Sequence, residues 1–177
     1  MGERVILQTA RLMLRPFTRD DVPALEAVIG DPVAMQWYPA PFDRAGVEQW
    51  IERNIARYEH DGHGLWAMVL KSSGELIGDC GCVVQVVEDR NEIEIAYHVR
   101  RDLWGNGYAT EAARACMDYA FNVIQVPRVI SMIRPENANS RRVAEKNGLK
   151  WEKVIRWAPR TATSPGFDHC IYTKTRT

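Results

Sequence analysis

The chain has 177 residues, of which 46% are hydrophobic and 26% charged, a composition typical of a globular protein with one core. Lys and Arg number 23, as do Asp and Glu, so the net charge of +0 favours neither nucleic acid nor an anionic membrane as partner. No apolar run approaches the roughly 20 residues of a membrane span, and the first residues lack a signal-peptide pattern. We therefore expect one domain over residues 1–177 in the cytoplasm, with the oligomeric state left open.

The first third of the chain predicts one strand and two helices. Residues 8–17 alternate apolar and polar side chains, which is typical of a strand. Thr18 can cap a first helix that ends near Gly30, and Asp43 can cap a second that ends at the Gly-rich turn after Asp61.

An aromatic segment separates these two helices. Residues 35–42 hold Trp37, Tyr38 and two prolines, and they follow neither the helical nor the strand period. They therefore predict a loop.

Three strands are predicted next, over residues 65–71, 75–87 and 91–99, and short polar turns between them predict antiparallel hairpins. The four cysteines, of which two fall on the second of these strands, form no Cys-x-x-Cys pair. We expect them to be small buried side chains rather than disulfides or metal ligands, and we expect no metal site.

The third strand leads into a glycine loop and then a helix. Residues 104–110 read Trp-Gly-Asn-Gly-Tyr-Ala-Thr, and an apolar stripe follows at helical spacing. Such a loop lets backbone N–H groups approach a phosphate at the positive end of a helix. The chain has no Gly-Lys-Ser/Thr for a triphosphate loop, and Thr110 stands where a dinucleotide fingerprint needs Gly or Ala.

The last third predicts strand, helix, strand and strand, over residues 128–134, 137–146, 149–157 and 167–174. Residues 159–166 predict a loop between the final two strands. Hairpins in the middle and helical crossovers later imply a mixed sheet with helices on both faces.

Two motifs in this order resemble the GNAT superfamily of acetyl-CoA-dependent N-acyltransferases. Gly107 and Ala109 fill the last two places of the pattern [Q/R]-x-x-G-x-[G/A], although Trp104 replaces the usual Gln or Arg. The string from Trp104 to Ala112 is similar to the branch that contains ribosomal-protein N-terminal acetyltransferases of the Rim type. Residues 137–149 resemble the signature of the family's fourth helix. The resemblance implies an α/β (α+β) fold with a mixed, mostly antiparallel central sheet of about seven strands and helices on both faces.

The resemblance also implies acetyl-CoA as cosubstrate. In this family one strand parts from its neighbour and the pantetheine arm lies between them, so backbone groups of Tyr97, His98 and Val99 are expected there. The Val99 N–H is the expected donor to the oxyanion. The pyrophosphate is expected within the loop formed by Trp104, Gly105, Asn106, Gly107, Tyr108, Ala109 and Thr110, with Trp104 serving as a packing aromatic.

Two carboxylates are candidates for handling the acceptor amine. Glu92 and Glu94 share one face of the 91–99 strand, opposite its apolar face, and His98 is a further candidate on the same face. A partly buried carboxylate has a raised pKa and is a better base. We expect Glu94 to act as base and Glu92 to contact the acceptor. Trp37 and Tyr38 are expected to line the acceptor site, and Trp66, at the start of a strand, either lines it as well or belongs to the core.

The leaving thiolate needs a proton, and the chain departs from the family at this point. Many family members have a tyrosine where Ala144 stands. Ser140 lies one turn earlier on the same helix face, so it is the expected proton donor. Asn137 would orient the pantetheine amide from that face.

The sequence thus predicts an N-acetyltransferase in which a primary amine attacks acetyl-CoA directly in a ternary complex. The acceptor amine is either a protein N-terminus or a small molecule, and fold analogy does not choose between them. The alternative is a coenzyme A-binding sensor or regulatory module without turnover.

Overall fold

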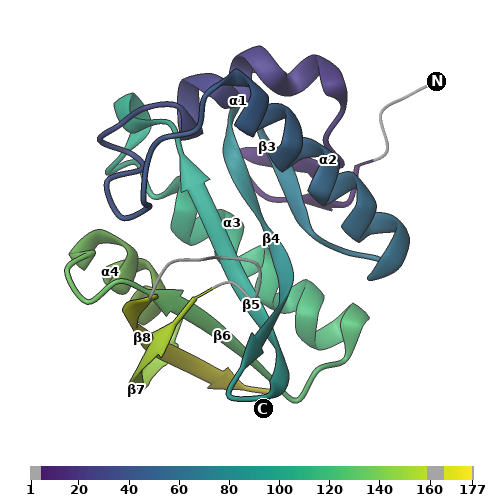
Figure 1. The fold of residues 1–177 in the computed structure, drawn as a ribbon. Helices are drawn as coiled ribbons and strands as arrows, with labels where there is room; N and C mark the ends of the chain where they lie inside the picture. Colours follow the sequence, from purple (N-terminus) through teal and green to yellow (C-terminus); the bar gives the residue numbers. More distant parts are fainter. Residues whose placement is uncertain (1–4, 159–165, 177) are drawn as a thin grey trace.

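The computed structural model describes residues 5–158 and 166–176. Within them one eight-stranded sheet runs in the order β1-β2-β3-β4-β5-β6-β8-β7 (Figure 1). Every neighbouring pair is antiparallel except β5 and β6, which are parallel. The strands are β1 (Leu7–Gln8), β2 (Leu12–Arg15), β3 (Leu65–Leu70), β4 (Leu76–Val87), β5 (Arg90–Val99), β6 (Arg128–Ile133), β7 (Lys150–Trp157) and β8 (Phe167–Thr175).

The fold agrees with the expected sheet of about seven strands and has eight, because the strand predicted over residues 8–17 is a hairpin. Thr9 turns the chain: its N–H donates to the Leu12 carbonyl at 2.9 Å, and its hydroxyl accepts from the Leu12 N–H at 2.9 Å. The chain on either side then pairs as β1 and β2. The loop predicted over residues 159–166 lies, apart from Gly166, outside the described residues.

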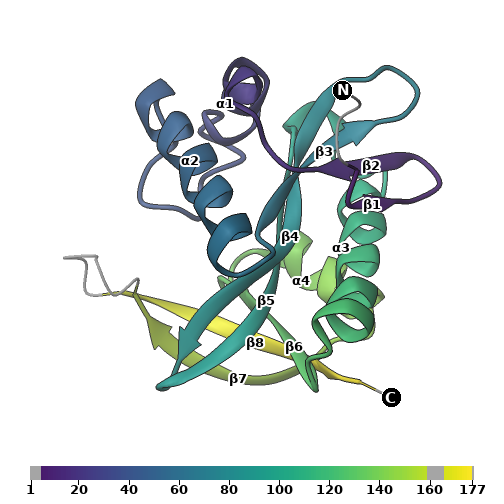
Figure 2. The ribbon, with the colours of Figure 1, turned by 90° about the vertical axis from the view of Figure 1, so that its right-hand side faces the viewer.

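Helices cover both faces of the sheet, as predicted (Figure 2). The helices α1 (Val22–Ile29) and α2 (Arg44–His60) lie on one face, and α3 (Tyr108–Tyr119) and α4 (Ala138–Lys146) lie on the other. Single turns at Arg19–Asp21, Arg101–Leu103 and Ala120–Ile124 extend or connect these elements.

Alternation along the strands builds a separate core under each helical layer. On β5, Ile95 and Val99 belong to the core beneath α3 and α4, whereas Ala96 packs toward α1 and α2. Trp66 of β3 is 1% exposed in the α3 core, with its ring 5.1 Å from that of Tyr119. The prediction that Trp66 lines the acceptor site is therefore corrected, because the side chain lies inside the protein.

All four cysteines are free and buried, as expected. Among the described residues, no helix is both long and apolar enough to span a membrane.

Candidate active site

The strands β5 and β6 separate at Glu94. Their only Cα register pair joins Glu94 to Ile130, and Ser131 Oγ donates to the Ile95 carbonyl at 3.0 Å. Beyond this point β5 stays paired to β4 as far as Val99, while β6 turns away with β8, so the arrowheads of β5 and β6 diverge (Figure 1).

This separation leaves one edge of β5 facing β6 without a strand partner. The Arg100 N–H donates to the Ile77 carbonyl of β4 at 2.8 Å. Because backbone groups alternate sides along a strand, the N–H groups of Tyr97 and Val99 point away from β4, toward the side where β6 has left. The Val99 carbonyl on that side accepts a hydrogen bond from Trp104 Nε1 at 2.7 Å, and the Trp104 side chain is 40% exposed.

The glycine loop follows directly after β5. Gly105 and Gly107 have φ values of +80° and +82°, and Gly107 is the N-cap of α3 without a side-chain cap on that helix. The first N–H groups of α3, at Tyr108, Ala109 and Thr110, therefore lie open to an anion.

Arg11, in the turn between β1 and β2, contacts the glycine loop. Its Nη1 donates to the Asn106 carbonyl at 2.9 Å, and its guanidinium lies 4.4 Å from the centre of the Tyr108 ring. Its Nε pairs with Glu111 at 2.7 Å, which turns the one acidic residue of the first helical turn away from the loop.

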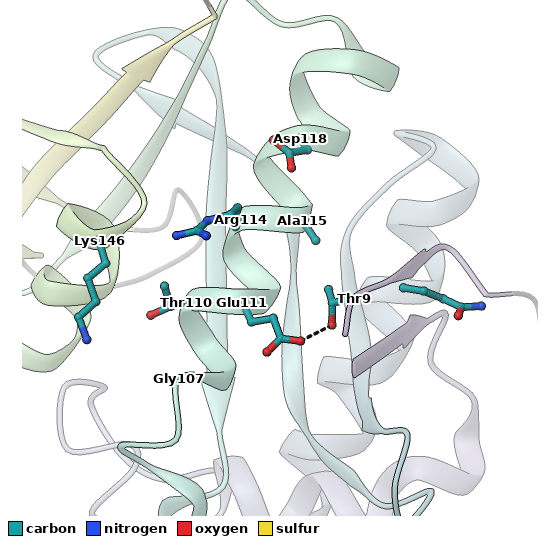
Figure 3. A pocket seen from close by; sticks show the side chains of 9 residues that line it. Thr9, Gly107, Thr110, Glu111, Arg114, Ala115, Asp118 and Lys146 are labelled. Atoms are coloured by element: carbon teal, nitrogen blue, oxygen red, sulfur yellow. Dashed lines mark hydrogen bonds between the residues drawn. The ribbon is translucent and has the colours of Figure 1, made fainter. Parts of the chain in front are cut away.

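A cavity of about 520 Å³ runs along this end of α3 (Figure 3). Two cationic side chains, Arg114 of α3 and Lys146 of α4, lie on its Thr110 side, whereas Glu111 turns toward Thr9. The cavity thus carries two cationic side chains on its Thr110 side, together with the acidic side chains of Glu111 and Asp118. The cavity is lined by Gln8, Thr9, Gly107, Thr110, Glu111, Arg114, Ala115, Asp118 and Lys146.

Glu94 is a buried carboxylate at the point of separation. It is 8% exposed, accepts from Gln85 Nε2 at 2.7 Å, and accepts from the Met132 N–H of β6 at 3.3 Å. Burial raises the pKa of Glu94 above its usual value, and the two hydrogen bonds together with His98 and Arg57 offset part of that increase.

Glu92 differs from Glu94 in its surroundings. Its carboxylate pairs with Arg128 Nη2 at 2.9 Å, and the same guanidinium bonds Glu152 of β7 at 3.1 Å. The expected acceptor contact of Glu92 is therefore corrected to an ion pair that ties β5, β6 and β7 together.

Two hydroxyl groups meet on the α4 side of β5. The hydroxyl oxygen of Tyr97 lies 2.9 Å from Ser140 Oγ and donates to the Ser140 carbonyl at 3.0 Å. Burial raises the pKa of Tyr97 well above its usual value, so its hydroxyl stays protonated. Asn137 caps α4, since its side-chain oxygen accepts from the Ser140 N–H at 3.1 Å.

On the opposite face, polar groups form a continuous chain from the interior to the surface. Trp50 Nε1 donates to Asp79 Oδ2 at 2.9 Å, and Asp79 Oδ1 lies 2.8 Å from His98 Nδ1. His98 Nε2 lies 2.9 Å from the Tyr38 hydroxyl. Asp79 is 0% exposed and Tyr38 40% exposed, so the chain links a buried carboxylate to the surface. Trp37 lies beside Tyr38 in the same loop and is half-buried.

Sequence reasoning missed three features of this site: the Asp79 carboxylate, the Trp50 indole, and the side-chain role of Tyr97. Asp79 sits in a strand of mostly apolar and small residues, and that interruption of the pattern was the available signal. Nothing in the sequence indicated that Tyr97 would reach a helix 43 residues away.

Comparison with known proteins accounts for this arrangement. The acetyltransferase (GNAT) domain family matches residues 11–150. The protein YkkB of Bacillus subtilis, described as uncharacterized, is 39% identical over 157 residues, which cover 88% of this chain and 91% of YkkB.

Solved structures agree with the sequence match. An acetyltransferase from Agrobacterium tumefaciens superposes with a TM-score of 0.79 at 28% identity, covering 99% of this chain and 96% of that one. The ribosomal L7/L12 alpha-N-protein acetyltransferase RimL, in complex with coenzyme A, shares the fold with a TM-score of 0.75 at 16% identity, covering 97% and 98% of the two chains. The chain belongs to the GNAT acetyltransferase family.

Proposed function

We propose that this protein transfers the acetyl group of acetyl-CoA to a primary amine, by direct attack with both substrates bound. One observation carries the proposal: a buried carboxylate, Glu94, lies where β5 leaves β6, and the N–H groups of Tyr97 and Val99 further along β5 have no strand partner on that side. The RimL relative that binds coenzyme A supports the identity of the cosubstrate.

The residues present fit coenzyme A. The loop at Gly105 and Gly107, with the uncapped start of α3, would hold the pyrophosphate, and Arg114 and Lys146 would compensate its charge. The unpaired edge of β5 at Tyr97 and Val99 would bond the pantetheine arm as a strand neighbour does. Bound there, acetyl-CoA would supply the thioester that the amine attacks.

The chain's own groups can then serve the transfer. The Val99 N–H would donate to the oxygen that becomes negative as the amine adds. Glu94, with its raised pKa, would take a proton from the nitrogen. Ser140, in contact with the Tyr97 hydroxyl, would return a proton to the departing sulfur. Asn137, whose side-chain oxygen is used as a cap, keeps its NH₂ group for the pantetheine.

The acceptor is proposed to be a protein N-terminus or a small-molecule amine, reached from the face that carries Tyr38 and Trp37. Buried free thiols accord with a reducing compartment, and we propose the cytoplasm.

A screen for acetylated products tests this function. Purified protein is incubated with acetyl-CoA and two panels, one of peptides with free N-termini and one of small primary amines, and products are identified by mass spectrometry. We expect acetylation of members of one panel, and N-terminally blocked peptides serve as the matched control. Acetyl-CoA binding without any acetylated amine would support a sensor instead.

A further inference from the structure

We propose that Asp79, His98 and Tyr38 form a proton relay that takes one proton from the acceptor's ammonium group and releases it to solvent. The inference rests on the proposed function and goes beyond it, because it assigns a proton path separate from Glu94. In this relay Tyr38 contacts the acceptor, whereas His98 and Asp79 act through Tyr38 as positioning residues.

The hydrogen bonds fix the direction of the relay. Ionised Asp79 can only accept, so at 2.8 Å it receives the Nδ1–H of His98, and its other oxygen receives the Trp50 N–H. The neutral imidazole then presents Nε2 as an acceptor, 2.9 Å from the Tyr38 hydroxyl. Tyr38 therefore donates to Nε2 and leaves its oxygen lone pairs free to accept.

The chemistry of acetyl transfer requires such a path. An ammonium group must lose two protons to become an amide; one can end on the coenzyme A thiol, and the other must reach bulk solvent. Glu94, buried between Gln85 and the Met132 N–H, is the proposed acceptor of one of these two protons. Among the described residues, Gln85 and Met132, which bond Glu94, are only partly exposed. Tyr38 is 40% exposed and therefore offers a route for the second proton to solvent.

The relay step balances. An N–H bond of the ammonium breaks and an O–H bond forms on Tyr38, while the original Tyr38 O–H breaks and an N–H forms on His98 Nε2. The positive charge thus moves from the acceptor to the imidazolium, whose Nδ1–H faces the Asp79 carboxylate. Return of the proton through Tyr38 to water resets the relay.

Several charged groups surround this imidazole. Asp79 faces it from β4 and Tyr38 from the loop before α2, while Glu94 lies on the same face of β5 and Arg57 of α2 acts on Glu94. Tyr38 is 40% exposed as a whole, but desolvation of its hydroxyl by the surrounding protein and the charges of Glu94 and Asp79 raise the pKa of Tyr38 above its usual value, so it works as a neutral carrier.

The first test needs no substrate. Long-range ¹H–¹⁵N spectra of ¹⁵N-histidine protein at about pH 8, above the ordinary histidine pKa of about 6.5, report which ring nitrogen carries the proton. We expect His98, assigned with His98→Gln, to be protonated at Nδ1, and its Nε2 shift to change in Tyr38→Phe. An Nε2–H tautomer, or no response to Tyr38→Phe, would overturn the relay even if acetylation is found.

The second test is kinetic, with the fastest amine from the acetylation screen as the acceptor probe. Tyr38→Phe and His98→Gln should each lower kcat/KM by about 10²-fold, and the double variant should be no slower than either one, because they interrupt one path. Asp79→Asn should lower kcat/KM to a similar extent, because the amide would favour the other tautomer of His98.

If Tyr38 had only a structural role, the loss of kcat/KM in Tyr38→Phe would not depend on pH. If Tyr38 belongs to the relay, that loss depends on pH. The deficit of Tyr38→Phe should shrink as the pH rises above the amine's own pKa, since a neutral amine needs no proton acceptor. His60→Gln is the matched control, because His60 also pairs with an aspartate, at 2.6 Å, but its side chain is 87% exposed. A deficit that is independent of pH, or effects of the two substitutions that multiply, would contradict the proposal. If the screen finds no acetylated amine, the proposed function is contradicted, whereas the tautomer of His98 can still be measured.

Discussion

Glu94 shows how one side chain can be prepared for proton transfer by its position. A strand neighbour would normally cover the edge of β5, but β6 departs there and its Met132 N–H turns to the carboxylate instead. The carboxylate is thus held in place and buried on the same strand as the backbone groups that would bind the thioester.

Replacing Glu94 by Gln keeps its size and removes the charge. We expect kcat/KM to fall by roughly 10²-fold, the range for a lost general base. A variant with the pH–rate profile of the wild type would show that Glu94 takes no part in proton transfer.

The same substitution has a consequence for stability. Because burial raises the folded-state pKa of Glu94, the wild type loses stability as the pH rises from about 4.5 through that pKa, and the Gln variant does not. The difference in Tm, variant minus wild type, should therefore increase with pH in thermal melts. Glu48→Gln, which removes a carboxylate that is 54% exposed, is the control, and a flat difference for Glu94→Gln would contradict the raised pKa.

Ser140 and Tyr97 are predicted to act as one unit on the leaving group, because their hydroxyls touch. Ser140→Ala should lower kcat by about tenfold, less than the usual loss for a general acid, since a thiolate leaves readily. The Kd for acetyl-CoA should change little. Ser73→Ala in the exposed turn before β4 serves as control, and an unchanged kcat with chemistry rate-limiting would exclude the role.

The alternation of side chains along β5 was enough to place Glu94 and His98 on one face from the sequence alone. The residues that contact His98 could not be predicted from this alternation. Tyr38 lies 60 residues from His98 in the sequence, and Asp79 lies 19 away across a hairpin, so their contacts depend on the strand register and on how the loop before α2 returns to the sheet.

At the scale of elements, the start of α3 combines a left-handed glycine with open N–H groups. Gly107→Val forces a branched residue to φ +82°, although the added Cβ would meet only Arg11 Nη2, at 3.5 Å. We expect the Kd for acetyl-CoA to rise roughly 100-fold, about 2.7 kcal/mol, when measured by calorimetry.

Gly74→Val provides the matched control, because Gly74 has φ +73° in an open turn remote from α3. Both variants should lose similar stability from the backbone, about 1–2 kcal/mol, and only Gly107→Val should lose affinity. Equal affinities in two folded variants would remove this loop from the binding site.

Element type and order could be predicted because helices and strands here carry clear periods and caps. The additional strand comes from Thr9, whose side chain closes a tight turn inside an otherwise alternating segment. A period cannot reveal such a turn, since the alternation continues on both sides of it.

At the scale of the molecule, the sheet consists of two parts that meet at a single register pair. The part from β1 to β5 carries Asp79 and His98, which bond each other, and the part from β6 to β7 carries Met132, whose N–H donates to Glu94.

The central claim is direct transfer from acetyl-CoA to an amine, and a paired measurement of thiol and product tests it most directly. Free thiol and acetylated amine are followed together after mixing enzyme, acetyl-CoA and the amine from the screen, and intact-protein mass is recorded before the amine is added. The account predicts thiol release only with amine present, one thiol for each acetylated amine, and an enzyme of unchanged mass. Thiol release before the amine is added, with an acetylated protein, would contradict it.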